Sequence, residues 1–462
     1  MTFFASKLCM LFSLIALSRA FAIPFKRTTS TNTATGCTDT DDSSTISSVI
    51  DLQSQHIALS PVERMESIQK SCEELGIEKF DVYGDYTLDE SSSYLRKFEA
   101  EIATDFGKED AVFMPSGVMA QNIALLIHSQ KEHQEQNEKN ILDNRFVCHH
   151  SSHLLLWEEE SYSALVGMRA IEIEANIKSA CEDNDGINGS PMSLQDVETV
   201  FSKEKAKLDD TSHSLGESGL SSLIIELPHR ELGGSLTPWM DVISIGELCK
   251  KNGVKYHCDG ARIFEASAGY GKSLSELADP FDSFYISFYK GLGSISGAML
   301  MGEKEFCDEA RVWLRRFGGN LYTLLPYAAP SWAGYRRHVK GQGLSMSFLD
   351  KFNKLKRITE KIESDTDFSK VARFNPRIPE TNMIHVYLKA SSDRCESVRD
   401  KAFETTGFKI FTRIRSIAED DHRYSSGYRT SFEWTMGEAN SSIEDESFVH
   451  AWRQFISILS EK

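Results

Sequence analysis

Residues 283–293 have the sequence Ser-Phe-Tyr-Ile-Ser-Phe-Tyr-Lys-Gly-Leu-Gly, an aromatic run that ends in Lys290 and passes directly into glycines. Aromatic and β-branched residues are typical of a buried strand, and Gly291 is typical of a turn that follows one. The preceding run of this kind ends in Asp259, and 290 − 259 places the lysine 31 residues further along. That spacing is about one strand–helix–strand step. The pattern predicts two parallel strands with a carboxylate and an amine at their carboxyl ends.

The same alternation of short apolar runs and helical stretches extends over residues 56–330. Seven runs have strand character: Ala111–Phe113, Arg145–Cys148, Ala170–Ile173, Leu223–Leu227, Val254–Cys258, Phe284–Phe288 and Ala298–Met301. Strands that alternate with helices predict an α/β fold. We therefore expect a large domain with a seven-stranded, mostly parallel sheet and helices on both faces.

The chain changes character from about Ser331. A charged amphipathic stretch at 347–364 predicts a helix, two strand-like runs follow at 383–388 and 428–433, and residues 443–459 predict a closing helix. Strands after helices in a smaller block predict a C-terminal α+β domain over residues 331–462. Two hydrophilic tracts within the large domain, 129–144 and 176–222, indicate surface insertions.

Composition excludes several classes of protein. The 462 residues include 51 Lys and Arg against 68 Asp and Glu, a formal charge of −17, which argues against nucleic acid as a partner. Hydrophobic residues are 40% and charged residues 26%, as in ordinary globular proteins. The nine cysteines form no C-x-x-C pair, and a chain of this length needs no disulfide framework.

The first residues indicate a targeting segment. An apolar run at 8–17 has the length of a secretory signal core, is too short to span a bilayer, and is followed by small residues at 18–20. Residues 1–20 are therefore expected to be a signal peptide. The stretch 21–55 begins with Phe21, is rich in Ser and Thr, and resembles the transit part of the bipartite presequence of algae with secondary plastids. We expect delivery to such a plastid or, alternatively, secretion, with no membrane attachment after removal of the presequence.

Lys290 suggests the chemistry. A charged amine at the end of a buried strand is destabilising unless it is neutralised or bonded, and a Schiff base with an aldehyde cofactor would neutralise it. Pyridoxal phosphate also needs a carboxylate to keep its ring nitrogen protonated, and Asp259 stands one strand earlier. The alternative is a strand-end lysine that simply reaches solvent.

Other polar features also follow predicted strand ends. Residues 113–120 predict a strand, a tight turn at Ser116 and Gly117, and a helix start, where backbone amides can bind a phosphate. His153 follows the second run and His229 follows the fourth. Open α/β sheets bind ligands beyond the carboxyl ends of their strands, so we expect these features to form one site.

At these positions the chain resembles the threonine aldolase and aromatic amino acid β-eliminating lyase family of fold type I pyridoxal-phosphate enzymes. The resemblance extends from about Asp81 to Arg429 and rests on four blocks: Asp81-Val82-Tyr83-Gly84-Asp85, Pro115-Ser116-Gly117, Asp259-Gly260-Ala261-Arg262 and Lys290-Gly291-Leu292-Gly293. It implies that Lys290 forms the Schiff base, that Asp259 pairs with the ring nitrogen and that His153 stacks on the ring.

The resemblance has further implications. Ser116, Gly117 and the backbone at Val118 would hold the phosphate, while Arg262 and Arg429 would bind the substrate carboxylate. A homodimer or homotetramer is expected. Three departures place the chain in a divergent branch: Val118 stands where the family usually has a hydroxyl, Leu321-Tyr322 where it often has an arginine, and residues 57–61 replace its usual N-terminal block.

Three competing motifs are weaker. Residues 266–273 fit a relaxed P-loop but follow a helical segment, and residues 291–297 have one residue too many for a dinucleotide fingerprint. Cys148, His149, His150 and His153 could bind zinc, yet no second ligand group follows at finger spacing, so we expect no metal.

The expected activity is cleavage of the Cα–Cβ bond of a β-hydroxy-α-amino acid, most simply threonine or allo-threonine to glycine and acetaldehyde. Lys290 would hold the cofactor, and His153 or His229 would remove the hydroxyl proton. The alternatives are β-elimination from another amino acid and a non-catalytic scaffold, against which the presence of both Lys290 and Asp259 argues.

A fusion of residues 1–55 to a fluorescent protein should enter the plastid of an algal host, because an apolar signal core and a hydroxyl-rich basic stretch act in series. Deletion of residues 8–17 should leave the fusion in the cytosol. Fluorescence microscopy distinguishes these outcomes, and appearance of the intact fusion in the medium would support secretion.

Overall fold

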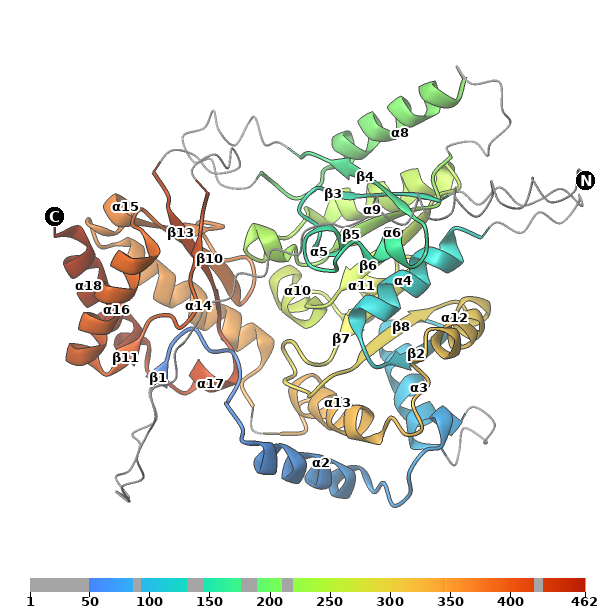
Figure 1. Cartoon of the computed structure of the whole chain (residues 1–462), viewed down its shortest axis with the longest axis horizontal. Helices are drawn as coiled ribbons and strands as arrows, with labels where there is room; N and C mark the ends of the chain where they lie inside the picture. The colour runs from blue at the N-terminus through green and yellow to red at the C-terminus, as the bar shows by residue number, and fades with distance from the viewer. Residues whose placement is uncertain are drawn as a thin grey trace, which may run out of the picture. The chain divides into compact units, whose positions relative to one another are not determined.

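The computed structural model describes residues 50–85, 93–130, 144–175, 189–209, 219–343, 345–418 and 427–461 (Figure 1). The predicted signal peptide, most of the stretch 21–55 and most of the tract 129–144 lie outside the described residues. The chain from Val49 onward forms one compact unit, which is described below. No helix of the described ranges is both long and apolar enough to cross a membrane.

A seven-stranded sheet forms the centre of the large domain. Its strands, in sheet order, are β2 (Asp110–Met114), β8 (Ala298–Gly302), β7 (Ser283–Ser287), β6 (Lys255–Gly260), β5 (Ser222–Glu226), β3 (Arg145–His149) and β4 (Arg169–Ile173). Only β8 runs antiparallel to its neighbours among these strands. The expected mostly parallel sheet is confirmed, and each of the seven predicted runs is a strand.

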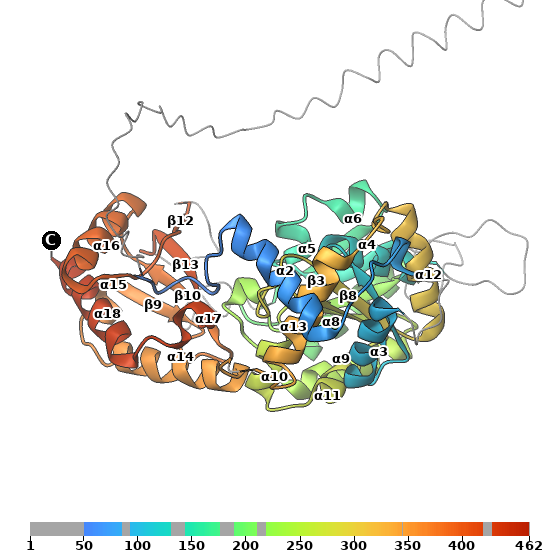
Figure 2. The same ribbon diagram turned by 90° about the horizontal axis from the view of Figure 1, so that it is seen from below.

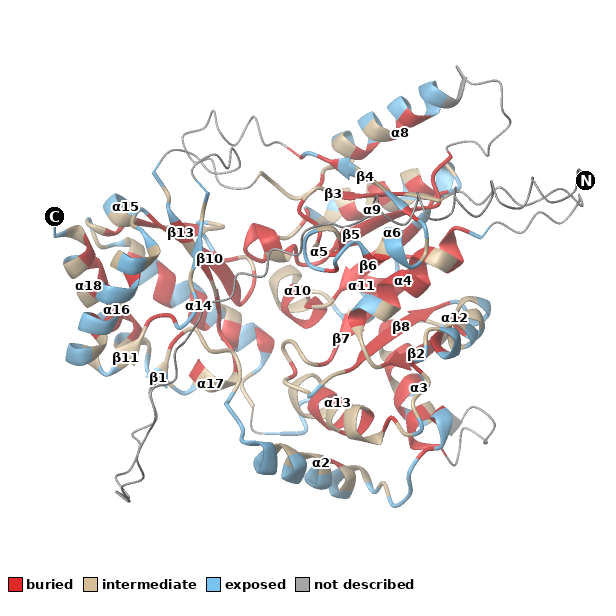
Figure 3. Cartoon of the chain, viewed as in Figure 1, coloured by how far each residue is buried: buried red, intermediate tan, exposed pale blue. Residues whose placement is uncertain are grey.

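Helices cover both faces of this sheet (Figure 3). One face carries α3 (Tyr94–Phe106), α8 (Leu194–Asp209), α9 (Trp239–Lys251), α10 (Ile263–Tyr270), α11 (Leu274–Ala278) and α13 (Leu325–His338); the other carries α4 (Gly117–His128), α5 (His153–Leu156), α6 (Ser161–Ala164) and α12 (Lys304–Arg316). The strand period of two explains this arrangement. In β2, Phe113 packs in the cluster of α3, whereas Val112 and Met114 pack in the cluster of α4 and α12.

The C-terminal domain has a sheet and a core of its own. Its antiparallel strands, in sheet order, are β12 (Arg415–Ser416), β13 (Thr430–Thr435), β10 (Met383–Leu388) and β9 (Ala372–Asn375), with α14 (Phe348–Glu363), α15 (Phe368–Val371), α16 (Ser392–Thr406), α17 (Glu438–Ser441) and α18 (Asp445–Ser460) around them. Trp434 and Trp452 lie in its apolar cluster. Helix α14 belongs to both cores, because Phe348 packs in the first cluster and Leu355 in the second.

The N-terminal part of the described chain connects the two domains (Figure 2). Strand β1 (Ile50–Asp51) pairs with β11 (Phe408–Lys409) of the C-terminal domain. Helix α2 (Pro61–Leu75) then packs against α13 of the large domain. Short 3₁₀ turns, η1 (Tyr83–Asp85) and η2 (Arg230–Leu232), complete the elements.

Candidate active site

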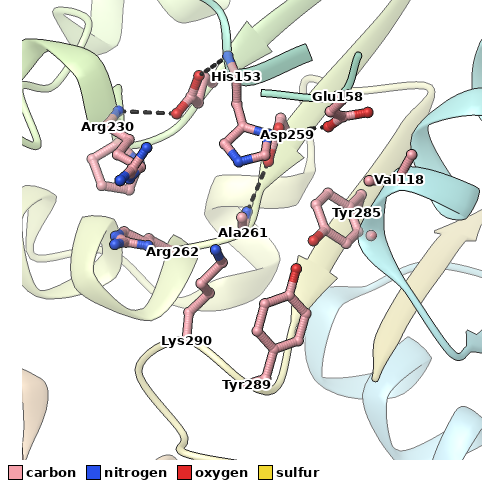
Figure 4. Close-up of a pocket in the computed structure, with 13 residues that line it drawn as sticks. Val118, His153, Glu158, Arg230, Asp259, Ala261, Arg262, Tyr285, Tyr289 and Lys290 are labelled. Carbon is pink, nitrogen blue, oxygen red and sulfur yellow. Dashed lines mark hydrogen bonds and ion pairs between the residues drawn. The ribbon is translucent and has the colours of Figure 1, made fainter. Parts of the chain in front are cut away.

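A cavity lies at the carboxyl edge of the large sheet (Figure 4). It is lined by Gly117, Val118, His153, Glu158, Glu226, Pro228, Arg230, Asp259, Ala261, Arg262, Tyr285, Tyr289 and Lys290. Except for Tyr285, which lies within β7, these residues end or follow β2, β3, β5, β6 and β7, all of which run in the same direction. The structure therefore brings Lys290, Asp259, His153, Arg262, Gly117 and Val118 together at one edge, where the sequence predicts the site.

Lys290 follows β7 and points its amine into the cavity (Figure 4). Burial, together with the guanidinium groups of Arg262 and Arg230, lowers the pKa of Lys290 from 10.5 to about 8. A lysine amine is nucleophilic only when it has lost its proton. An amine in this environment would be available to bond to an aldehyde at a lower pH than an ordinary lysine.

Asp259 is a buried carboxylate at the end of β6. The backbone N–H of Ala261 donates to its Oδ1 at 3.0 Å, and Gln121 Nε2 donates to its Oδ2 at 2.5 Å. Burial, and the nearby carboxylate of Glu226, raise the pKa of Asp259 to about 7. A carboxylate held in this way would be stabilised by a protonated nitrogen in the cavity.

His153 begins α5 and is held by two carboxylates. Its backbone N–H donates to Glu226 Oε2 at 3.1 Å, and its Nδ1 lies 3.1 Å from Glu158 Oε1. Burial by itself would lower the pKa of His153, but the hydrogen bond with Glu158 and the charges of Asp259 and Glu226 raise it above the usual value. Because a carboxylate only accepts, Nδ1 carries the hydrogen and Nε2 is left to accept a proton.

The turn before α4 forms the side of the cavity expected to bind phosphate. Ser116 caps α4 by accepting the N–H of Met119 at 3.3 Å. Gly117 is required at the next position, because a Cβ there would lie 2.0 Å from Tyr285 Oη. The first amides of a helix have no intrahelical acceptors, so this turn offers backbone donors. The hydroxyls of Tyr285 and Tyr289 face each other near Val118 (Figure 4).

Arg262 is paired with a carboxylate of the C-terminal domain. Glu433 Oε1, on β13 of the C-terminal domain, lies 2.7 Å from Arg262 Nη2, and its Oε2 lies 2.9 Å from Arg230 Nε. Burial opposes the charge of Glu433, but the two guanidinium groups hold its pKa well below the usual range. Arg429, predicted beside Arg262, is exposed at the start of β13 and does not line the cavity.

His229 also lies outside the cavity lining. Its Nε2 is 3.0 Å from Ser151 Oγ, and its ring packs edge-on against His149 at 4.6 Å. Its neighbour Arg230 enters the cavity instead. His229 and Arg230 both follow the end of β5, so the rule that located His229 could also have located Arg230. Among the described residues, no cluster of three His, Cys, Asp or Glu side chains is suited to a metal ion.

The beta-eliminating lyase family matches residues 81–391, more than half of the chain. The chain belongs to the beta-eliminating lyase family. An Arabidopsis thaliana protein provisionally named low-specificity L-threonine aldolase 2 is 27% identical over 357 residues, 76% of this chain and 86% of that protein. The low specificity L-threonine aldolase of Escherichia coli K12 is 26% identical over 241 residues, 52% of this chain and 60% of that protein.

The fold of this beta-eliminating lyase family member has counterparts among solved structures. A Listeria monocytogenes protein provisionally named an L-allo-threonine aldolase superposes with a TM-score of 0.68 and 27% identity, covering 87% of this chain and 95% of that chain. The structure of a serine palmitoyltransferase with a pyridoxal-phosphate internal aldimine shares the fold at 11% identity and a TM-score of 0.56, covering 89% of this chain and 86% of that chain.

The chain is a pyridoxal-phosphate-dependent lyase, and its cavity fits the cofactor. The fit rests on the buried carboxylate of Asp259, whose pKa is raised by burial and by Glu226, and on the amine of Lys290 with its lowered pKa. Lys290 would hold the aldehyde carbon, Asp259 the ring nitrogen, and the Gly117 turn the phosphate.

In cofactor-free protein, acetylation of Lys290 should be half-maximal near pH 8, because the buried amine loses its proton there. Lys304 is an internal control, since its ion pair with Asp308 raises its pKa and should keep it charged at that pH. Mass spectrometry of digested protein measures both sites. Glu433→Gln should move the Lys290 midpoint to lower pH, because Glu433 favours the ammonium form. Equal profiles for Lys290 and Lys304 would contradict the assignment.

Proposed function

We propose that this chain cleaves the Cα–Cβ bond of β-hydroxy-α-amino acids, with L-threonine or L-allo-threonine giving glycine and acetaldehyde. The observation that supports this most directly is the convergence of Lys290, Asp259, His153 and Arg262 on one cavity. The names of the relatives in Arabidopsis, Escherichia coli and Listeria support the same reaction. Pyridoxal phosphate, when bound, supplies an aldehyde for the substrate amine and a ring that takes up the electron pair of the broken bond.

Arg262 and Arg230 are placed to bind the substrate carboxylate. Both guanidinium groups line the cavity, and Glu433 fixes one edge of each. The buried Arg262 Nε has no hydrogen-bond acceptor among the described residues. An unsatisfied buried guanidinium donor is destabilising, and a carboxylate oxygen would satisfy it. In this proposal Arg230 takes the role that the sequence assigned to Arg429.

His153 is placed to accept the proton of the substrate hydroxyl at Nε2. Its hydrogen bond to Glu158 fixes the tautomer that leaves Nε2 without a hydrogen. The same contact raises the pKa of His153, so the imidazole becomes a stronger base. His229 is bonded to Ser151 and does not line the cavity, which leaves a water molecule as the alternative acceptor.

Purified protein reconstituted with pyridoxal phosphate should release glycine and an aldehyde from β-hydroxy-α-amino acids. A panel of L-threonine, L-allo-threonine, L-cysteine and L-tyrosine separates this reaction from β-elimination, which would release ammonia and a keto acid. Lys290→Ala should remove the covalent cofactor and turnover. Ammonia release in place of glycine would show that the protein is a β-eliminating enzyme.

His153→Phe should retain the flat ring surface while removing the proton acceptor. We expect cofactor and glycine to bind nearly as in the wild type, and threonine cleavage to fall by about 10²-fold or more, as for other lost general bases. Steady-state kinetics and glycine titration of the cofactor absorbance measure the two effects. Near-normal cleavage by the variant would assign the proton transfer to water.

A further inference from the structure

Four buried side chains form a continuous row of hydrogen bonds that ends on Asp259. Gln121 Nε2 donates to Asp259 Oδ2 at 2.5 Å, and His257 Nε2 lies 2.8 Å from Gln121 Oε1. The second nitrogen of His257, Nδ1, lies 2.6 Å from Ser283 Oγ, and His128 Nε2 lies 2.6 Å from the same oxygen. We call these four residues the buried row. None of them lines the cavity.

Burial makes the buried row depend on its own hydrogen bonds. Gln121, His257 and Ser283 are at most 1% exposed, and His128 is 8% exposed. Burial lowers the pKa of each histidine to about 3, so both imidazoles are neutral and have one N–H each. Unsatisfied polar groups in such a place are strongly destabilising, so each donor must meet an acceptor.

The chemistry of these groups gives the buried row a single direction. A primary amide donates from its nitrogen and accepts at its oxygen, so Gln121 can donate to Asp259 only if His257 Nε2 donates to Gln121. His257 Nδ1 is then an acceptor and takes the hydroxyl hydrogen of Ser283. The oxygen of Ser283 in turn accepts the N–H of His128. Every hydrogen of the buried row therefore points toward Asp259, whose Oδ2 is an acceptor, the role that an ionised carboxylate fills most strongly.

The reverse direction would require a different protonation state. If Asp259 were protonated at Oδ2, that oxygen would donate to the oxygen of Gln121, and the amide would have to turn over. The ring hydrogen of His257 would then have to move from Nε2 to Nδ1, and the hydroxyl of Ser283 would have to rotate. Protonation of Oδ2 is thus linked to the rearrangement of three side chains, so the buried row disfavours a proton at that oxygen.

Other titratable groups face Asp259 from the cavity side. They are Glu226 on β5, His153 and Glu158 at α5, Lys290 after β7, and the tyrosines Tyr285 and Tyr289. Glu226 and Glu158 disfavour the charge of Asp259, while His153 favours it. The donor from Gln121 and the Ala261 N–H are the direct hydrogen bonds that Asp259 receives among the described residues.

We propose that the buried row makes Gln121 a positioning residue, which keeps Asp259 ionised so that the shared proton stays on the cofactor's ring nitrogen. His257 and Ser283 act through Gln121 by fixing the direction in which its amide points. This inference rests on the cofactor binding that the proposed function requires. The buried row lies entirely outside the cavity, yet in this inference it helps to determine how readily the ring takes up electrons.

The test reads the ring nitrogen directly in holoenzyme loaded with nitrogen-15-labelled pyridoxal phosphate. In the wild type the NMR shift should be that of a protonated pyridine. Gln121→Met retains the volume but removes the donor, so the ratio of protonated to unprotonated ring nitrogen should fall about tenfold or more, as for one pKa unit. His257→Leu should shift this ratio less, and Ser283→Ala least, because they act at increasing distance.

Asn122→Leu is the matched control. Asn122 is the next residue of α4, is also 1% exposed, and its amide donates to Val118 O and Ser161 Oγ, both at 2.8 Å, rather than to Asp259. Its loss should lower the melting temperature but leave the ring nitrogen signal unchanged. A purely structural role for Gln121 would give the same result as this control and would overturn the inference.

Three further outcomes are distinguishable. If Gln121→Met does not accumulate as folded protein, His257→Leu applies the same test without touching Asp259, and an unchanged signal in that variant would refute the inference. If the wild type itself binds no pyridoxal phosphate, the proposed function fails as well. If the wild type binds it and cleaves threonine while Gln121→Met retains a protonated ring, only the buried row is excluded.

Discussion

The site depends on placing two ionisable groups of opposite charge in one largely buried cavity. Asp259 ends β6 and Lys290 follows β7, and these strands pair directly in the parallel sheet. Burial opposes the charged form of each group, raising one pKa and lowering the other. The surrounding residues therefore have to supply charge and hydrogen bonds. Gln121 on α4 donates a hydrogen bond to Asp259, and Glu433 on β13 supplies negative charge that favours the ammonium form of Lys290.

Much of this arrangement could be predicted from the sequence, because parallel strands bring their carboxyl ends to one edge. The seven strand runs, the turn before α4 and the pair Asp259 and Lys290 all follow from local patterns of apolar residues and glycine. The sequence patterns were most informative where a strand, a turn and a charged residue were adjacent in the chain. His153 was located by the same rule, since it begins α5 shortly after β3 ends at His149.

The rest could not be predicted because it depends on long-range packing and on side-chain direction. Glu433 reaches Arg262 across 171 residues, from a strand of another domain. No local pattern distinguishes it from Arg429, which stands nearby on the same segment but is exposed. His229 and Arg230 are consecutive, so they satisfy the same strand-end rule, yet only the second faces the cavity. Sequence position determines which edge a residue reaches, but not which way its side chain points.

The contact between Gly117 and Tyr285 has a consequence for how this pocket can change over evolution. The hydroxyl of Tyr285 occupies the space that any side chain at position 117 would need. A larger residue at 117 is therefore tolerated only together with a smaller one at 285, and the two positions should covary in descendants of this chain. Engineering the pocket for a bulkier ligand should accordingly start from Tyr285, since its truncation opens space that changes at Val118 alone cannot provide.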